Sequence, residues 1–194
     1  MANAIPDRAF LRAADMPGVI KGAPRRLGDG EVPLPTFCGA GFEQADRIDA
    51  RGTLRYYFSS PGAPAEATPK AMVHHQVLVY RDGGATDFMD GLRTCVTGCK
   101  SQNEDGVELR NHLHGPFGEA DDSVVVEQTR PATDETGTPL DDGTLHSVFW
   151  AAARVGEAVA FVSIAGWESC SAEEADALTL GKKAARRLRE WRES

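Results

Sequence analysis

Hydrophobic and polar side chains alternate most clearly between residues 144 and 164, in the stretch TLHSVFWAAARVGEAVAFVSI. The pattern predicts two β-strands joined by a turn at Gly156-Glu157, because glycine in the first position of a two-residue loop is typical of a type II′ hairpin. Successive side chains of a strand point to opposite faces, so this register places a wholly apolar set on one face, which we expect to be core. That set is Phe149, Ala151, Ala153, Val155, Ala158, Ala160, Val162 and Ile164.

The opposite face of the same hairpin carries large aromatic residues beside polar ones. It contains His146, Val148, Trp150, Arg154, Phe161 and Ser163. A face of this kind is either lightly solvated sheet or the floor of a binding cleft. We take four of its members as candidate ligand-binding residues: His146, Trp150, Arg154 and Ser163.

Patterns elsewhere in the chain predict the remaining elements. Runs rich in β-branched and aromatic residues predict strands at 53–58, 71–80, 107–114 and 122–130. Apolar residues at helical spacing predict helices at 6–14, 85–98 and about 171–192. The first two strands are expected to pair antiparallel, and Ser171 and Glu174 are expected to form a capping box at the start of the last helix.

This order of elements indicates an α+β fold. We expect a single central antiparallel sheet of about 5–6 strands, packed by two or three helices on one face. A chain of 194 residues is of ordinary size for one domain, so the prediction is a single domain that spans 1–194.

Charge and hydropathy narrow the choice of partners. The formal net charge of −8 disfavours binding to nucleic acid, because such binding requires clustered Lys and Arg. It also disfavours docking on an anionic membrane surface. No apolar run reaches the roughly 18 residues that a membrane-spanning helix needs.

The four cysteines, Cys38, Cys95, Cys99 and Cys170, bear on the cellular compartment. None has the C-x-x-C spacing of a zinc ribbon or a thioredoxin-like site. The residues alone are compatible with two disulfides, with reduced buried thiols and with a metal site. Disulfides would indicate an exported protein.

Histidines and acids supply no complete catalytic or metal-binding motif. His112 and His114 share a strand face, which is a usable spacing for metal ligands, but they border a polar loop, and we expect no metal and no cofactor. The sequence has no G-x-S-x-G elbow, and no aspartate can be named that would orient His146 beside Ser163. A small hydrolase that uses His146 is therefore an alternative rather than the first hypothesis.

Several stretches together carry a resemblance to a known family. They are the opening FLRAADMPG, Cys38 after a proline-rich stretch, the strand at 71–80, the helix at 85–98 with Cys99 after it, and SVFWAAARVGEAVAFVSIAGW before the terminal helix. They resemble secreted actinobacterial sensor-type domains and lipoproteins, similar to the extracellular sensor domain of the mycobacterial kinase PknH. The resemblance implies an α+β fold with a central antiparallel sheet, a cleft for an unknown ligand, and two disulfides, Cys38–Cys99 and Cys95–Cys170.

The first functional hypothesis is therefore a non-catalytic, extracytoplasmic ligand-binding or sensor-type domain. We expect it to be secreted or lipid-anchored, with any leader outside these 194 residues, and to act as a monomer on a small molecule or a cell-envelope component. Besides the hydrolase, a protein-interaction module is an alternative, and it would expose an apolar patch rather than a hollow.

Overall fold

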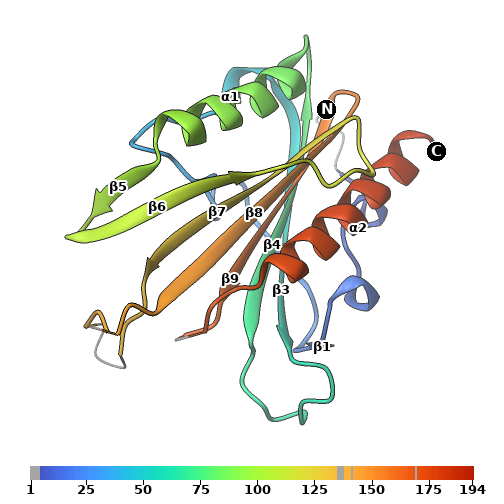
Figure 1. Ribbon diagram of the computed structural model, residues 1–194. Helices are drawn as coiled ribbons and strands as arrows, with labels where there is room; N and C mark the ends of the chain where they lie inside the picture. Colours follow the sequence, from blue (N-terminus) through green and yellow to red (C-terminus); the bar gives the residue numbers. More distant parts are fainter. Residues whose placement is uncertain (1–4, 135–137, 141, 169) are drawn as a thin grey trace.

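The computed structural model describes residues 5–134, 138–140, 142–168 and 170–194. Within these ranges nine strands form one antiparallel sheet, which extends between two α-helices (Figure 1). The strands are β1 (Val19–Ile20), β2 (Arg25–Leu27), β3 (Ile48–Ser59), β4 (Ala71–Tyr80), β5 (Ser101–Glu104), β6 (Val107–His114), β7 (Asp122–Pro131), β8 (Leu145–Val155) and β9 (Ala158–Gly166). The helices are α1 (Gly84–Gly98) and α2 (Glu174–Arg192), and short 3-10 turns occur at η1 (Asp7–Ala9), η2 (Ala13–Asp15) and η3 (Ala45–Arg47).

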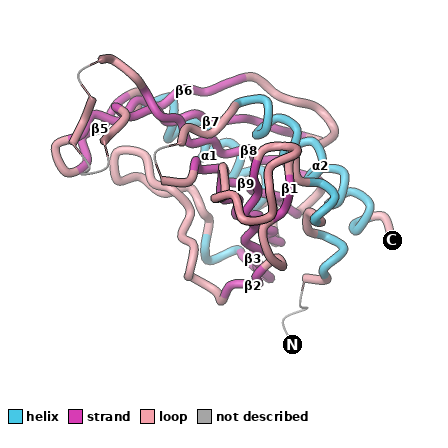
Figure 2. Tube along the Cα trace, turned by 90° about the horizontal axis from the view of Figure 1, so that it is seen from below, coloured by secondary structure: helices cyan, strands magenta, loops and turns pink. Residues whose placement is uncertain are grey.

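The sheet has the order β1-β3-β4-β9-β8-β7-β6-β5, and β2 also pairs with β3. The antiparallel α+β architecture is as predicted, but the sheet has more strands than the sequence suggested. The additional strands β1, β2 and β5 have two, three and four residues, too few to show a period of two. Figure 2 shows β5 on the opposite side of the molecule from α2.

The central hairpin has the predicted register. Phe149 pairs with Ile164 and Val155 with Ala158, and Gly156 turns the chain with φ of 56°. All eight residues of the predicted apolar face are buried in one hydrophobic core. Helix α2 supplies the other side of that core, through Leu180, Ala184 and Leu188.

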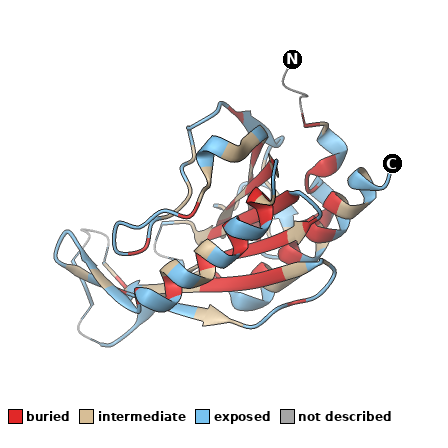
Figure 3. Ribbon diagram, turned by 90° about the horizontal axis from the view of Figure 1, so that it is seen from above, coloured by how far each residue is buried: buried red, intermediate tan, exposed pale blue. Residues whose placement is uncertain are grey.

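The two α-helices cover opposite faces of the sheet, which corrects the expectation that they share one. Helix α1 packs on the face that carries Trp150 and Phe161, whereas α2 packs on the face that carries Phe149. Figure 3 shows buried residues along the strands and on the helix side that faces them. The second core forms because the mixed face of the hairpin is apolar along half its length, at Trp150, Ala152, Val159 and Phe161, and burying such surface is favourable.

The N-terminal segment does not form the predicted helix over 6–14; it crosses the sheet as an extended strap with two 3-10 turns. Side chains of the sheet form hydrogen bonds with backbone groups of the strap, which in a helix would bond to one another. The Leu11 N–H donates to His75 Nδ1 at 3.0 Å, and the Tyr56 hydroxyl donates to the Leu11 carbonyl at 2.6 Å. The strap is also fixed to α2, since Arg187 donates through Nε and Nη2 to the two carboxylate oxygens of Asp15, at 3.1 Å each.

The predicted capping box of α2 is absent, because Ser171 has another partner. Its hydroxyl accepts a hydrogen bond from the Ser147 N–H at 2.9 Å, and the helix begins at Glu174. Among the described residues, no helix combines the length and the apolar composition needed to cross a membrane.

Close contact of α2 with β8 depends on Gly181. A Cβ added at this position would lie 2.9 Å from Ala151 Cβ and 3.0 Å from the Phe117 ring. We expect Gly181→Ala to lower the free energy of unfolding by about 1 kcal/mol, because overpacking outweighs the gain in helix propensity. Urea denaturation measures this change, and Gly98→Ala in α1, where nothing lies within 4 Å of the added Cβ, is the matched control. An equal gain in stability for both variants would contradict the tight packing.

Candidate functional site

The four predicted ligand-binding residues all lie on the α1 side of the sheet but do not form one cluster. Trp150 and Ser163 are direct neighbours across β8 and β9. His146 and Arg154 lie near opposite ends of β8, eight positions apart, which is about 26 Å at a strand's rise. The structure therefore brings Trp150 and Ser163 together and separates the other two from each other.

Arg154 belongs to the end of the sheet near the β8–β9 turn. Its Nη1 donates to the carbonyl of Gly156 at 3.3 Å and lies 4.0 Å from a carboxylate oxygen of Asp121. Its Nε is buried without a hydrogen-bond partner in the described part of the chain. These contacts give Arg154 a structural role at the turn.

A cavity of about 420 Å³ lies beside Trp150. Its walls come from the segment that precedes β3 and from β5, and its floor comes from β7 and β8. The lining residues are Pro35, Thr36, Cys38, Gly39, Gln102, Asn103, Glu104, Gln128 and Trp150. His146, Arg154 and Ser163 are not among them.

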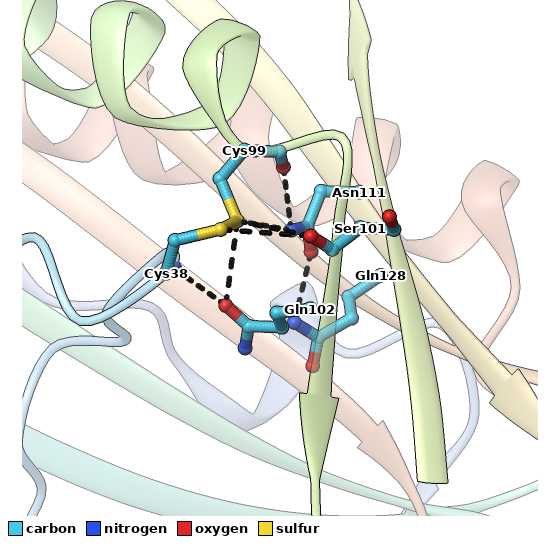
Figure 4. Close-up of a disulfide and its surroundings, with 6 residues drawn as sticks. All are labelled: Cys38, Cys99, Ser101, Gln102, Asn111 and Gln128. Atoms are coloured by element: carbon cyan, nitrogen blue, oxygen red, sulfur yellow. Dashed lines mark hydrogen bonds between the residues drawn. A yellow bond between two sulfur atoms is a disulfide. The ribbon is translucent and has the colours of Figure 1, made fainter.

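One wall of this cavity is held covalently. Cys38 and Cys99 form a disulfide that ties the segment around residues 35–39 to the end of α1 (Figure 4). This is one of the two bonds implied by the family resemblance. The cavity wall is thereby attached to a helix that packs on the sheet.

The second implied disulfide, Cys95–Cys170, is not formed, and both residues are free thiols. Cys95 packs against the α1-side core, and its sulfur lies 3.8 Å from the Gly41 carbonyl oxygen. Cys170 is exposed in the segment that leads to α2, and its neighbour Ala172 is buried in the core on the other face. The sheet lies between Cys95 on the α1 side and the segment of Cys170 on the α2 side. The two cysteines therefore do not pair, as they could have done if both helices covered one face.

Trp150 is both a core residue and part of the cavity lining. Only 9% of it is exposed, and its ring packs edge-to-face against Phe37 with centroids 5.9 Å apart. The indole N–H has no acceptor among the described residues and is not among the buried polar atoms that lack a partner, so it is accessible to solvent. Trp150 therefore belongs both to the core on the α1 side and to the wall of the cavity.

Three side-chain amides next to the disulfide form an ordered network. The Asn111 side chain must donate to the Cys99 carbonyl, 2.8 Å away, because a carbonyl can only accept. The Asn111 oxygen then accepts from Gln128 Nε2 at 2.9 Å. On the other side of the disulfide, the Cys38 N–H donates to Gln102 Oε1. Backbone groups that can only donate or only accept thus determine which end of each amide is the oxygen and which is the nitrogen.

His74 lies in the same row across the sheet as Ser163 and Trp150, although it does not line the cavity. His74 is the β4 neighbour of Ser163, which in turn is the neighbour of Trp150. Burial, together with the nearby positive charge of Arg55, lowers the pKa of His74 to about 4. His74 is therefore a neutral imidazole at pH 7, and only its position in the sheet register could have identified it.

A second polar cluster lies near the start of α2. The Ser147 hydroxyl donates to Glu127 at 2.7 Å, and the two ring nitrogens of His114 lie 3.1 Å from Glu127 and 3.3 Å from Glu174. An activated serine contacts a histidine, which in turn contacts an acid. Here the serine contacts the carboxylate of Glu127 instead of the imidazole, so the cluster does not have that arrangement. Across the described ranges no group of three or more His, Cys, Asp or Glu side chains is placed to hold a metal ion.

The antiparallel sheet with a helix on each face defines an α+β fold that a solved extracellular domain shares. The fold is similar to that of the extracellular domain of PknH from Mycobacterium tuberculosis, with a TM-score of 0.56 over 100% of both chains and 12% sequence identity. A scan of known protein families and a search of curated proteins each find no match. The likeness is one of fold, and to that extent it confirms the resemblance inferred from the sequence.

Proposed function

We propose that this chain is a non-catalytic, extracytoplasmic ligand-binding domain of the sensor type. The observation that carries the proposal is the cavity beside Trp150, whose wall is fixed by the Cys38–Cys99 disulfide. A cavity of a few hundred Å³ with a preformed wall suits a small molecule or a fragment of a cell-envelope component. The likeness to an extracellular domain supports the extracytoplasmic location, as does a disulfide, which persists in oxidising compartments.

The chemistry of the lining favours binding over catalysis. It consists of side-chain amides, Thr36, a glycine, a proline, the disulfide, an indole and one carboxylate. Neither a nucleophile–base pair nor a pair of carboxylates is among these groups, and general acid–base catalysis depends on such positioned pairs.

The alternative hydrolase depends on His146, and its surroundings do not favour that role. His146 lies opposite Arg130 across β7 and β8. It makes no hydrogen bond with any acid or hydroxyl in the described ranges. A histidine that lacks both an orienting acid and a nucleophile does not supply a triad.

The proposal predicts a local spectroscopic response to ligand. With 5-fluorotryptophan in place of tryptophan, the three tryptophans give three ¹⁹F signals. We expect fragments that bind the cavity to shift the Trp150 signal, while the signal of Trp191, near the end of α2, stays in place.

The matched variant is Thr36→Trp, which places a large ring at the exposed edge of the cavity. We expect it to abolish the shift of the Trp150 signal and to leave thermal stability close to that of the original chain. If a small-molecule library and an extract of cell-envelope material both leave the Trp150 signal unmoved, the proposed function is wrong.

A further inference from the structure

The amide hydrogen bonds leave two groups whose polarity is fixed and which have no partner among the described residues. Gln102 uses its oxygen for the Cys38 N–H, so its Nε2 group is a free donor. Gln128 uses its nitrogen for Asn111, so its Oε1 atom is a free acceptor. In Figure 4 the free ends of both amides are directed away from the disulfide. Both residues line the cavity, so it presents an oriented donor and an oriented acceptor.

The other polar groups of the cavity likewise include both hydrogen-bond donors and acceptors. Asn103 uses its side-chain oxygen for the Gly106 N–H at 3.0 Å, which leaves its amide nitrogen as a donor. The Trp150 indole N–H is a further donor, and the Glu104 carboxylate is an acceptor without an ion-pair partner in the described part of the chain. A matching ligand must offer donors and acceptors in similar number.

The charge of the cavity lining disfavours an anionic ligand. The cavity lining contains Glu104 and no Lys, Arg or His, and the whole chain has a net charge of −8. An anion placed there would meet a carboxylate without a compensating cation, which is unfavourable. The lining therefore offers no charge that would recognise an anion.

We propose that the cavity binds a neutral saccharide, an inference that rests on the proposed function. Each sugar hydroxyl both donates and accepts, so adjacent hydroxyls match the Gln102 donor and the Gln128 acceptor together. The C–H face of a sugar ring suits the apolar surface of Pro35 and the disulfide, and the Trp150 indole N–H can donate to a hydroxyl.

The test uses the methyl glycosides of glucose, mannose, galactose and xylose, together with acetylated dialanine amide as a neutral peptide probe. Titration of the fluorotryptophan-labelled chain is expected to shift the Trp150 signal with at least one glycoside, and not with the peptide. Methyl glucuronide, which adds a carboxylate to the glucose ring, is expected to bind roughly tenfold more weakly than methyl glucoside, and Glu104→Gln is expected to reduce this difference.

Two substitutions test the hydrogen-bonding pair. Gln128→Met preserves length but removes the free acceptor together with the hydrogen bond to Asn111, and we expect it to weaken glycoside binding about tenfold. Gln44→Met, at a position outside the cavity lining, is the matched control and should bind as the original chain does. Equal affinities of the Gln128→Met variant and its control would overturn the proposal.

Gln102→Glu distinguishes a hydroxyl ligand from an amide ligand. It keeps an acceptor for the Cys38 N–H and converts the free donor into an acceptor. A sugar hydroxyl can rotate to donate, so we expect glycoside affinity to change by less than about threefold, whereas a ligand carbonyl could not adapt. A tenfold loss with this variant contradicts a hydroxyl contact at Gln102.

The two levels of proposal fail in different ways. If other fragments shift the Trp150 signal but no glycoside does, the ligand class is wrong and the binding function stands. If nothing shifts that signal, both are wrong.

Discussion

Replacing Cys38 and Cys99 together by serine is expected to lower the free energy of unfolding by about 4 kcal/mol. The bond closes a loop with a sequence separation of 61 residues, and the chain-entropy treatment assigns about this cost to a loop of that length. Cys99 is almost fully buried, with 3% exposure, so the serine hydroxyl would add a polar group to the core. If the cavity binds a saccharide as proposed, glycoside binding should weaken in parallel, because the cavity wall would lose its covalent attachment.

Guanidinium chloride denaturation with and without a reducing agent measures this effect. The double variant Cys95→Ser, Cys170→Ser is the control, since both residues are free thiols, and it should unfold near the midpoint of the original chain. If reductant leaves the midpoint of the original chain unchanged, the disulfide does not contribute to stability.

Acidification from pH 7.5 to pH 5 is expected to cost the original chain about 2 kcal/mol more than it costs a His75→Gln variant. Complete burial lowers the pKa of His75 to about 3, from about 6.5 in the unfolded chain. The folded state thus resists a proton that the unfolded state accepts. The contribution of His75 is fully present above pH 6.5 and is lost as the pH falls toward 3, at 1.36 kcal/mol per pH unit.

Urea denaturation at several pH values measures this difference in slope. Tyr56→Phe is the control, because Tyr56 also contacts the Leu11 backbone but its pKa is raised by burial and lies far from this range. Tyr56→Phe should lower stability equally at both pH values. Parallel pH profiles for the original chain and His75→Gln would show that His75 is not held neutral in the fold.

The sequence predicted the elements whose patterns are long. The hairpin of β8 and β9, strand β4 and helix α1 each contain enough residues for a period of 2 or 3.6 to be seen. The N-terminal strap has the apolar spacing of a short helix. Its backbone nevertheless bonds to His75 and Tyr56, which are more than 40 residues away, and no local pattern reports such contacts.

The candidate site could be predicted only in part, because it is made by tertiary contacts. Alternation along β8 correctly placed Trp150 on the side of the sheet that contains the cavity. Gln102 lies on a four-residue strand in a polar segment, and Gln128 is one polar residue at the end of a hydrophobic run. Their relevance arises from the Cys38–Cys99 bond and the Asn111 network, which bring together residues distant in sequence.

The pairing of β4 with β9 has a consequence for how the chain matures. Strands β5 to β8 lie between these two partners in the sequence, so the β3–β4 hairpin emerges from the ribosome long before β9 does. During that interval the edge of β4, with its buried Val73 and Val77, is an unpaired template for association with other chains. Completion of the sheet by β9 is a non-local closure step, and we expect it to limit the folding rate.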